Sequence, residues 1–256
     1  MTEPPRLEVR GLTVRFGGFR ALSEVSWSVR SGQILGIIGP NGAGKSTCFN
    51  ATTNMVPHDG QVLLDGRDVT DLPAHRLAER GLHRTFQQNA FFGGISVLEN
   101  MTGALLRTAG TPLAAAVLLP WVEYRRRRQA EEAAGALLAR FGVPAVLHAL
   151  PPGSLPYGTQ RMLSIALAYA DDARVLLLDE PAAGLGGSDM EKLADTLAAL
   201  RAEGLGIVLI EHHMDLVMEL ADHLVVLEQG EMLAEGPPSL IQSDPRVLEA
   251  YLGHAA

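Results

Sequence analysis

Two segments near the start of the chain alternate between apolar and polar positions. They are LEVRGLTVRF (7–16) and EVSWSV (24–29), and the glycine pair Gly17-Gly18 follows the first of them. A period of two is typical of strands in an antiparallel sheet with one face in water, and glycines suit the turn between such strands. The pattern therefore predicts an antiparallel β subdomain at the N-terminus.

The middle of the chain has a helical period instead. The stretch from Val97 to Phe141 is rich in alanine and leucine, and charged residues separate its apolar positions. The apolar positions at helical spacing are Ala130, Ala133, Ala134, Leu137, Leu138 and Phe141. This spacing predicts an amphipathic helix. We therefore expect a helical insert over roughly 88–165.

Continuous apolar runs follow toward the C-terminus. They are RVLLLDE (174–180), GIVLIE (206–211) and HLVVLE (223–228), and helical patterns such as the one that begins at Met190 separate them. Strands that are buried on both faces have this composition when they alternate with helices in a parallel sheet. The fold class is therefore predicted to be α/β, with a parallel-sheet core and a helical insert.

Composition and charge narrow the class further. A chain of 256 residues with 47% hydrophobic content can bury one large core, and a net charge of −8 argues against DNA or anionic lipid as the main partner. The single cysteine, Cys48, excludes an internal disulfide and a cysteine-rich zinc site. The start, MTEPPRLEVR, lacks the basic and apolar regions of a signal peptide, and the apolar tract Leu113–Val122 is too short to span a bilayer. These features predict a cytoplasmic protein.

The first chemical motif follows the apolar run QILGII. In GPNGAGKST (39–47), Gly39 is followed after four residues by Gly44, Lys45 and Ser46, which is the spacing of a phosphate-binding loop between a strand and a helix. Glycines let backbone N–H groups face phosphate oxygens, Lys45 is expected to reach the β and γ phosphates, and Ser46 is expected to ligate Mg²⁺. The predicted nucleotide-binding residues of this loop are Gly39, Pro40, Asn41, Gly42, Ala43, Gly44, Lys45, Ser46 and Thr47. The alternative is a glycine-rich turn that matches by chance.

A second acidic motif ends one of the buried runs. In RVLLLDEP, Asp179 is expected to hold Mg²⁺, directly or through water, and Glu180 to orient and deprotonate the attacking water. Adjacent side chains on a strand point in opposite directions, so the pair can divide these tasks. A solvated strand end followed by a turn is the alternative.

Together these two sites resemble those of the ATP-binding cassette (ABC) transporter ATPases, and the resemblance covers essentially the whole chain. It implies ATP and Mg²⁺ as cofactors and a single P-loop NTPase domain over 1–256. The domain would combine a RecA-like core (approximately 1–87 and 166–256), the N-terminal antiparallel β subdomain and an α-helical insert (approximately 88–165) that carries the signature motif.

Three further segments are similar to motifs of this family. TFQQ (85–88) resembles the Q-loop, which implies that Gln87 approaches Mg²⁺ and the water and joins the core to the insert. LIEHHMDLVM places His212 at the switch histidine, which would contact the γ-phosphate and help orient Glu180. Phe16 in RFGG falls where an aromatic ring stacks on adenine, with Phe19 as a rival and a core position as the alternative.

The segment SLPYGTQR (154–161) falls at the family's signature motif, which normally resembles LSGGQ and serves the ATP bound to a facing subunit. The implied signature residues are Leu155, Pro156, Tyr157, Gly158, Thr159 and Gln160. Pro156 replaces a serine and supplies neither a hydroxyl nor an N–H, and Gly186 replaces a usual aspartate, for which Asp189 comes too late to be an obvious substitute. We therefore expect an asymmetric heterodimer, with a harmless capping variant as the alternative.

One branch of the family is especially similar. RTFQ, LPYG, DEPAAGL, IEH and DPRVLEAYLG resemble the larger ATP-binding subunit of branched-chain amino acid importers, a group whose relatives also move urea and other amides. The branch implies two permease subunits, a second and different ATPase, an indirect extracytoplasmic binding protein, no nucleic acid, and a peripheral position on the cytoplasmic face of the membrane. A soluble ABC switch in DNA repair or translation is the alternative, although neither tandem cassettes nor a long coiled coil is evident. A kinase that uses the phosphate loop is a third interpretation, which the signature and switch segments disfavour.

Three other features are predicted to be structural. Cys48 is expected to be buried, and His213 has no assigned role and is expected to be solvated. The run Arg125–Arg128, followed by Glu131 and Glu132, is expected to be a solvated helix face with spaced ion pairs, with lipid headgroup contact as the alternative.

Overall fold

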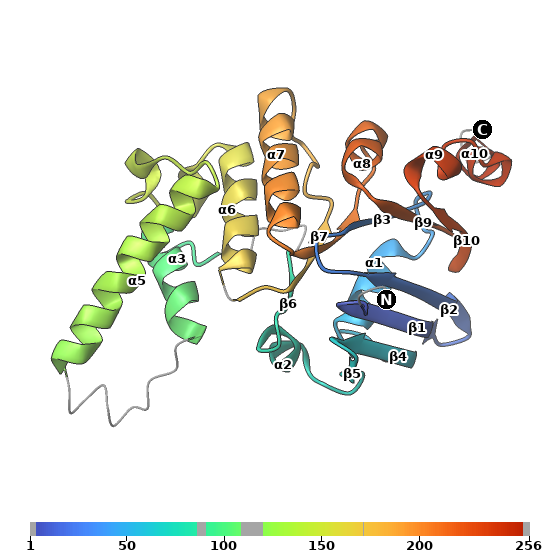
Figure 1. The fold of residues 1–256 in the computed structure, drawn as a ribbon, viewed down its shortest axis with the longest axis horizontal. Coiled ribbons are helices and arrows are strands. Elements are labelled where there is room, and N and C mark those ends of the chain that lie inside the picture. Colours follow the sequence, from blue (N-terminus) through green and yellow to red (C-terminus); the bar gives the residue numbers. More distant parts are fainter. Residues whose placement is uncertain (1–3, 86–90, 109–119, 171, 253–256) are drawn as a thin grey trace. The chain divides into compact units, whose positions relative to one another are not determined.

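The computed structural model of the protein describes residues 4–85, 91–108, 120–170 and 172–252 (Figure 1). Contacts between residues divide the chain into two compact units. The first comprises 1–84, 174–183 and 194–256, and the second comprises 85–173 and 184–193. The predicted subdomain limits, near 87 and 166, stay a prediction.

The first unit begins with an antiparallel sheet. Its strands are β1 Leu7–Phe16, β2 Phe19–Val29, β4 Asp59–Leu64 and β5 Arg67–Asp68, in the spatial order β2-β1-β4-β5. The turn at Gly17, whose φ is +60°, joins β1 to β2 and pairs Phe16 with Phe19. The predicted N-terminal antiparallel subdomain is thus confirmed, and β2 starts five residues earlier than the alternating pattern indicated.

The second sheet of this unit has six strands in the order β10-β9-β3-β8-β7-β6. They are β3 Ile34–Ile38, β6 Leu82–Arg84, β7 Val175–Asp179, β8 Gly206–Ile210, β9 His223–Glu228 and β10 Glu231–Gly236. The pairs from β6 to β9 are parallel, which confirms the predicted parallel core, whereas β10 joins the edge in antiparallel register.

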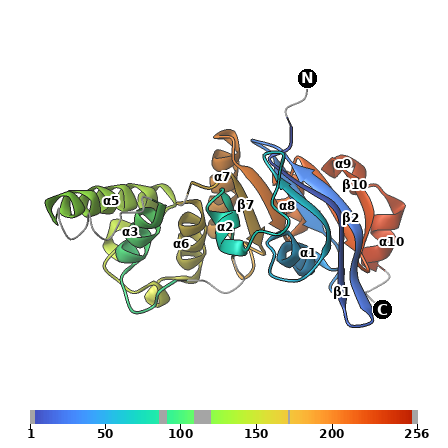
Figure 2. The same cartoon turned by 90° about the horizontal axis from the view of Figure 1, so that it is seen from below.

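The continuous apolar runs arise because both faces of this sheet are covered. Leu35, Ile37 and their neighbours on one face share a core with α1 (Lys45–Thr52) and with the antiparallel sheet. Figure 2 shows α1 beside β1 and β2, both of which it contacts. On the opposite face, Val217 of α8 (Met214–Leu220) lies against Gly36 of β3. The remaining helices of the first unit are α2 (Ala74–Ala78), α9 (Pro238–Ile241) and α10 (Pro245–Leu252), while α7 (Ser188–Ala202) contributes residues to both units.

The second unit is helical. Its elements are α3 Val97–Thr108, α5 Pro120–Arg140, the 3₁₀ turns Ala145–Leu147 and Pro152–Ser154, and α6 Tyr157–Tyr169. Ala134, Leu138 and Phe141 are buried as the periodicity predicted, whereas Ala133 is exposed, so the apolar stripe is narrower than expected. None of the helices in the described residues is long and apolar enough to cross a membrane.

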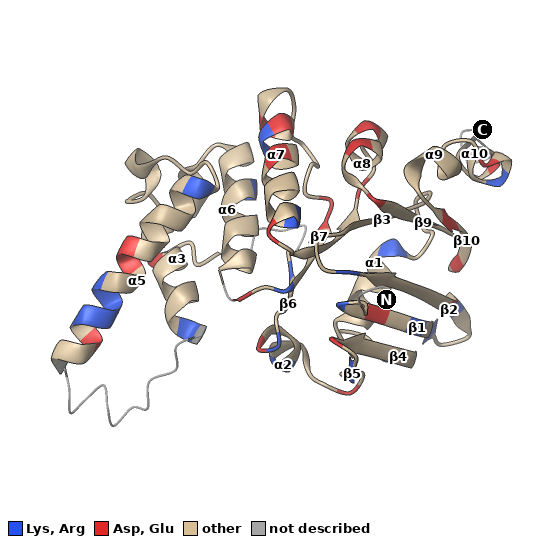
Figure 3. Ribbon diagram, in the orientation of Figure 1, with Lys and Arg blue, Asp and Glu red and all other residues tan. Residues whose placement is uncertain are grey.

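Figure 3 shows the basic run on α5 beside acidic residues, and two of its arginines form the ion pairs that the spacing predicted. Arg127 lies 3.2 Å from Glu131, and Arg128 lies 3.4 Å from Glu132, each four residues further along the helix. All four side chains are exposed, from 43% for Glu131 to 71% for Glu132. The interpretation as a solvated helix face is confirmed for these pairs.

Candidate active site

The predicted phosphate loop connects the buried strand β3 to the N-terminus of α1, as expected. Two of its glycines are required by their surroundings. A side chain at Gly39, where φ is +148°, would meet the carbonyl oxygen of Leu227 at 2.0 Å. A side chain at Gly44, where φ is +100°, would meet the carbonyl oxygen of Ala21 at 2.9 Å. The loop therefore lies directly on the backbone of its neighbours, which fixes where its N–H groups point.

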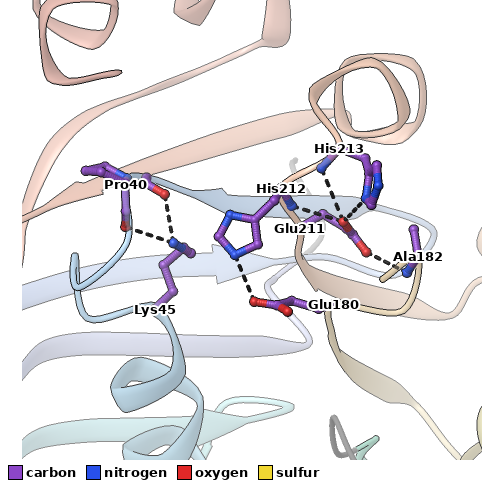
Figure 4. A network of polar contacts seen from close by, with 8 residues as sticks. Pro40, Lys45, Glu180, Ala182, Glu211, His212 and His213 are labelled. Atoms are coloured by element: carbon purple, nitrogen blue, oxygen red, sulfur yellow. Dashed lines mark hydrogen bonds and ion pairs between the residues drawn. The ribbon is translucent and has the colours of Figure 1, made fainter. Parts of the chain in front are cut away.

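Lys45 is the first residue of α1, and only 6% of its surface is exposed. Its Nζ donates hydrogen bonds to the carbonyl oxygens of Gly39 (2.7 Å) and Pro40 (3.0 Å), as Figure 4 shows for Pro40. Burial lowers the pKa of Lys45, and the negative charges of Glu180 and Asp179 oppose that shift. An ammonium held this close to the loop can exchange these two carbonyl oxygens for phosphate oxygens with a small movement of its side chain.

A pocket of about 310 Å³ opens over this loop. Its lining residues are Phe16, Phe19, Ala21, Asn41, Gly42, Ala43, Gly44, Lys45, Ser46, Thr47, Glu180 and His212. The structure thus brings most of the predicted nucleotide-binding residues together, with Gly39 and Pro40 beneath them. Phe16 and Phe19 are 51% and 69% exposed, so either ring is accessible to a stacked base. The preference for Phe16 stays a prediction.

Asp179 ends β7 and is 3% exposed. Its Oδ2 accepts a hydrogen bond from the Arg84 guanidinium at 2.8 Å, and Arg84 also donates to Oδ1 of Asn50 at 2.7 Å. The second carboxylate oxygen, Oδ1, is buried and has no hydrogen-bond partner among the described residues. A buried, negatively charged oxygen of this kind suits a cation. Arg84 was not predicted to belong to the site, and its only signal in the sequence is a basic residue just before the predicted Q-loop.

Glu180 and His212 both line the pocket and are in contact with each other. His212 Nε2 lies 2.8 Å from Glu180 Oε1 (Figure 4), and their side chains are 42% and 23% exposed, respectively. Glu180 adopts a φ of +50°, which is uncommon for a residue with a side chain. The two predicted residues come from the ends of neighbouring parallel strands, β7 and β8, and their contact leaves the carboxylate accessible to a water molecule.

Two residues beside this pair, Glu211 and His213, had no predicted role in the site. Glu211, which follows β8, is buried and accepts hydrogen bonds from both loops of the site. His213 is exposed, as expected, with 43% of its side chain accessible, and its Nδ1 lies 3.0 Å from Glu211 Oε2. Neither contact has a sequence signal beyond the letters IEHH.

The signature segment belongs to the second unit. Pro156 is the N-cap of α6, with φ −54° and ψ 145°, so the proline fits its backbone position. Gln160 Nε2 donates to the Leu155 carbonyl oxygen at 2.8 Å. A side chain at Gly158 would lie 2.3 Å from Asp189 Oδ2, which places Asp189 beside the first turn of α6. Gln87 lies outside the described residues, and the roles of Tyr157, Thr159 and the other signature residues stay predictions.

A phosphate loop between a parallel strand and a helix, with acidic residues at the end of another strand of the sheet, defines a P-loop nucleotide hydrolase. The chain's sequence matches the profile of the ABC transporter family over residues 22–183 and that of branched-chain amino acid ATP-binding cassette transporters over 231–256.

Known proteins resemble the chain over nearly its full length. It is 41% identical to the high-affinity branched-chain amino acid transport ATP-binding protein BraF of Pseudomonas aeruginosa over 253 residues, which cover 98% of this chain and 99% of that protein. It is 39% identical to the corresponding protein LivG of Escherichia coli K12, with the same coverage. A crystal structure of the ADP conformation of an ATP-binding cassette from an ABC transporter superposes with a TM-score of 0.82 at 30% identity, covering 98% of this chain and 99% of that one.

The chain therefore belongs to the ABC transporter family and is an ABC-type ATPase that binds nucleotide. The predicted fold, a P-loop cassette with an antiparallel subdomain and a helical insert, and the predicted branch are both confirmed.

Proposed function

We propose that this protein is the ATP-hydrolysing subunit that energises import of branched-chain or related amino acids across the cytoplasmic membrane. The 2.8 Å contact between Glu180 and His212 beside the phosphate loop carries the ATPase part of this proposal. The cargo is supported by the full-length similarity to BraF and LivG and by the C-terminal match at 231–256. Urea or other small amides are the alternative cargo class.

The site residues act by positioning and charge. Lys45 leaves the carbonyl oxygens of its own loop and binds the β and γ phosphates, while backbone N–H groups of the loop and the start of α1 hold the remaining oxygens. Ser46 and the unpartnered oxygen of Asp179 would hold Mg²⁺. When bound, the cation neutralises charge on the phosphate oxygens. Gln87 would add the further metal and water contact that the family resemblance implies.

Glu180 and His212 serve the attacking water. The Glu180 carboxylate orients the water in line with the γ-phosphate and takes its proton. His212 holds Glu180 through the contact at Oε1 and reaches the γ-phosphate. The aromatic ring of Phe16 stacks on the adenine at the rim of the pocket.

The proposed transporter complex has the composition that the resemblance to branched-chain amino acid importers implies. Two permease subunits in the membrane would bind the cassettes, a second and different ATPase would face this chain, and an extracytoplasmic binding protein would deliver the cargo. This chain would lie on the cytoplasmic face of the membrane as a peripheral subunit. Because Pro156 lacks an N–H, the partner's nucleotide would receive fewer hydrogen bonds than this chain's own, and the two sites would turn over at different rates.

Purification from native membranes in mild detergent tests this proposal. Mass spectrometry should find two permeases and a second ATPase with this chain, and the reconstituted complex should accumulate leucine or a related amino acid in ATP-loaded vesicles. A homodimer without membrane partners would refute the importer and favour a soluble switch. Uptake of urea but not leucine would change the cargo alone, and equal nucleotide turnover at the two sites would refute the asymmetry.

A further inference from the structure

The carboxylate of Glu211 is buried, with 1% of its side chain exposed, and four N–H groups converge on it (Figure 4). Oε1 accepts a hydrogen bond from the backbone N–H of Ala182 at 2.6 Å. Oε2 accepts from the backbone N–H groups of His212 at 3.0 Å and His213 at 3.3 Å, and it also contacts His213 Nδ1. No arginine or lysine is paired with Glu211 in the described part of the chain. Hydrogen bonds from two separate loops therefore satisfy this buried charge.

The two loops that Glu211 joins carry Glu180 and His212, the residues proposed to serve the attacking water. Ala182 lies two residues after Glu180, and His212 is the residue after Glu211 itself. The Glu180 N–H also donates to the Ile210 carbonyl oxygen at 2.9 Å, which brings the same loops together from the other side. Because Glu180 has an uncommon φ of +50°, its loop needs external contacts to stay in this conformation.

The chemistry requires a carboxylate rather than its amide. A carboxylate is acceptor-only, so both oxygens can receive N–H groups, whereas a glutamine at this position would turn an NH₂ group toward one set of donors. Replacing Oε1 would remove the Ala182 contact, and replacing Oε2 would remove the contacts at 212 and 213. Because Glu211 belongs to the His212 loop, the first loss would remove its hydrogen bond to the Glu180 loop. The second loss would leave the backbone N–H groups of His212 and His213 facing an NH₂ group. The side-chain volume is unchanged in both cases.

We propose that Glu211 is a positioning residue for ATP hydrolysis, because it clamps the Glu180 loop to the His212 loop and so sets the Glu180–His212 contact. Glu211 does not reach the pocket over the phosphate loop, so it acts through the other two residues. The inference rests on the proposed roles of Glu180 and His212.

The test is the Glu211→Gln variant of the full-length chain, purified and assayed as part of its transporter complex. We expect kcat for ATP hydrolysis to fall about 10- to 100-fold, the scale found when a supporting contact of a site is lost. The Kd for ATP, measured by fluorescent nucleotide displacement, should stay within about twofold, because the phosphate loop is untouched. The matched control is Glu231→Gln, which makes the same chemical change on an exposed carboxylate at the start of β10 and should retain kcat within about twofold.

A non-additivity test separates positioning from general destabilisation. In single-turnover assays, Glu211→Gln should have little further effect in a Glu180→Gln background, because the group it positions is already inactive. If Glu180→Gln alone kept the wild-type rate, the proposed function of Glu180 would be wrong. If Glu180→Gln abolished turnover but Glu211→Gln kept kcat, only the positioning inference would be overturned.

If Glu211→Gln does not fold, a second variant, Glu211→Asp, tests the proposal. Glu211→Asp keeps the charge and both acceptor oxygens but is one methylene shorter, so it can accept from its own loop and not from Ala182. We expect it to fold and to show a kcat loss of the same order with an unchanged Kd for ATP. A wild-type kcat in Glu211→Asp would overturn the proposal.

Discussion

The ion pair between Arg84 and Asp179 offers a quantitative test of the structure. Both side chains are almost fully buried, with 8% and 4% of their surface exposed, so removing the guanidinium leaves an unpaired carboxylate in the interior. Breaking a buried pair in this way typically costs about 3–5 kcal/mol, and the lost hydrogen bond to Asn50 adds about 1 kcal/mol. We expect Arg84→Met, which keeps the apolar bulk, to lower the free energy of unfolding by about 4–6 kcal/mol.

The assay is urea unfolding of the full chain without nucleotide or divalent cation. The double variant Arg84→Met/Asp179→Asn, which removes the unpaired charge as well, should recover more than half of the lost stability, because a neutral amide is far easier to bury than a carboxylate. A loss below about 1 kcal/mol for Arg84→Met, where a buried pair predicts several times more, would refute the reasoning. So would a double variant that is as unstable as the single one.

Other predictions address the site and the surface. Lys45→Ala should weaken ATP binding about 10- to 100-fold through lost charge-assisted hydrogen bonds, and unchanged equilibrium binding would contradict this. Glu180→Gln should bind ATP normally but lose about 10²–10⁴-fold in kcat, measured as phosphate release; wild-type release would exclude it as the base. Burial raises the pKa of the Cys48 thiol from about 9 to about 11, so the unfolded chain loses this proton at a lower pH than the folded chain. The free energy of unfolding should therefore fall between pH 9 and pH 11. Iodoacetamide at pH 8 should label Cys48 in the unfolded protein but not in the native protein. Rapid labelling of the native thiol would refute its burial. Arg127→Ala should change the unfolding free energy by less than about 0.5 kcal/mol, because its pair with Glu131 is exposed.

Much of the fold could be predicted because its signals are local. The alternation in 7–16 and the apolar runs that became β7, β8 and β9 depend only on which faces are buried. The edge strand β10 was not predicted, because its sequence, EMLAEG, has neither strict alternation nor a continuous apolar run, and it pairs through its backbone with β9. The exposure of Ala133 could not be predicted either, because alanine fits both faces of a helix.

The same distinction holds for the candidate site, where residues with a local sequence signal were predicted and residues joined by long-range contacts were not. The phosphate loop and the Asp179-Glu180 pair have fixed spacing, so sequence reasoning could find them. Arg84 lies 95 residues from its partner Asp179, and Glu211 is held mainly by backbone N–H groups, which every residue except proline carries. Such contacts leave no pattern of residue types along the chain and emerge only when the strands are placed side by side.

The contacts that Lys45 makes without nucleotide are the state against which its contacts with ATP must be compared. Its two hydrogen bonds to Gly39 and Pro40 satisfy the buried ammonium before any phosphate arrives. For Lys45, ATP binding is therefore an exchange of acceptors, and its contribution to the measured affinity is the excess of phosphate over carbonyl oxygens. The same exchange runs backward when product leaves, so the loop supplies its own substitute ligand and the emptied site never exposes an unsatisfied buried charge. A cassette built in this way can pass repeatedly through a nucleotide-free state without losing its fold.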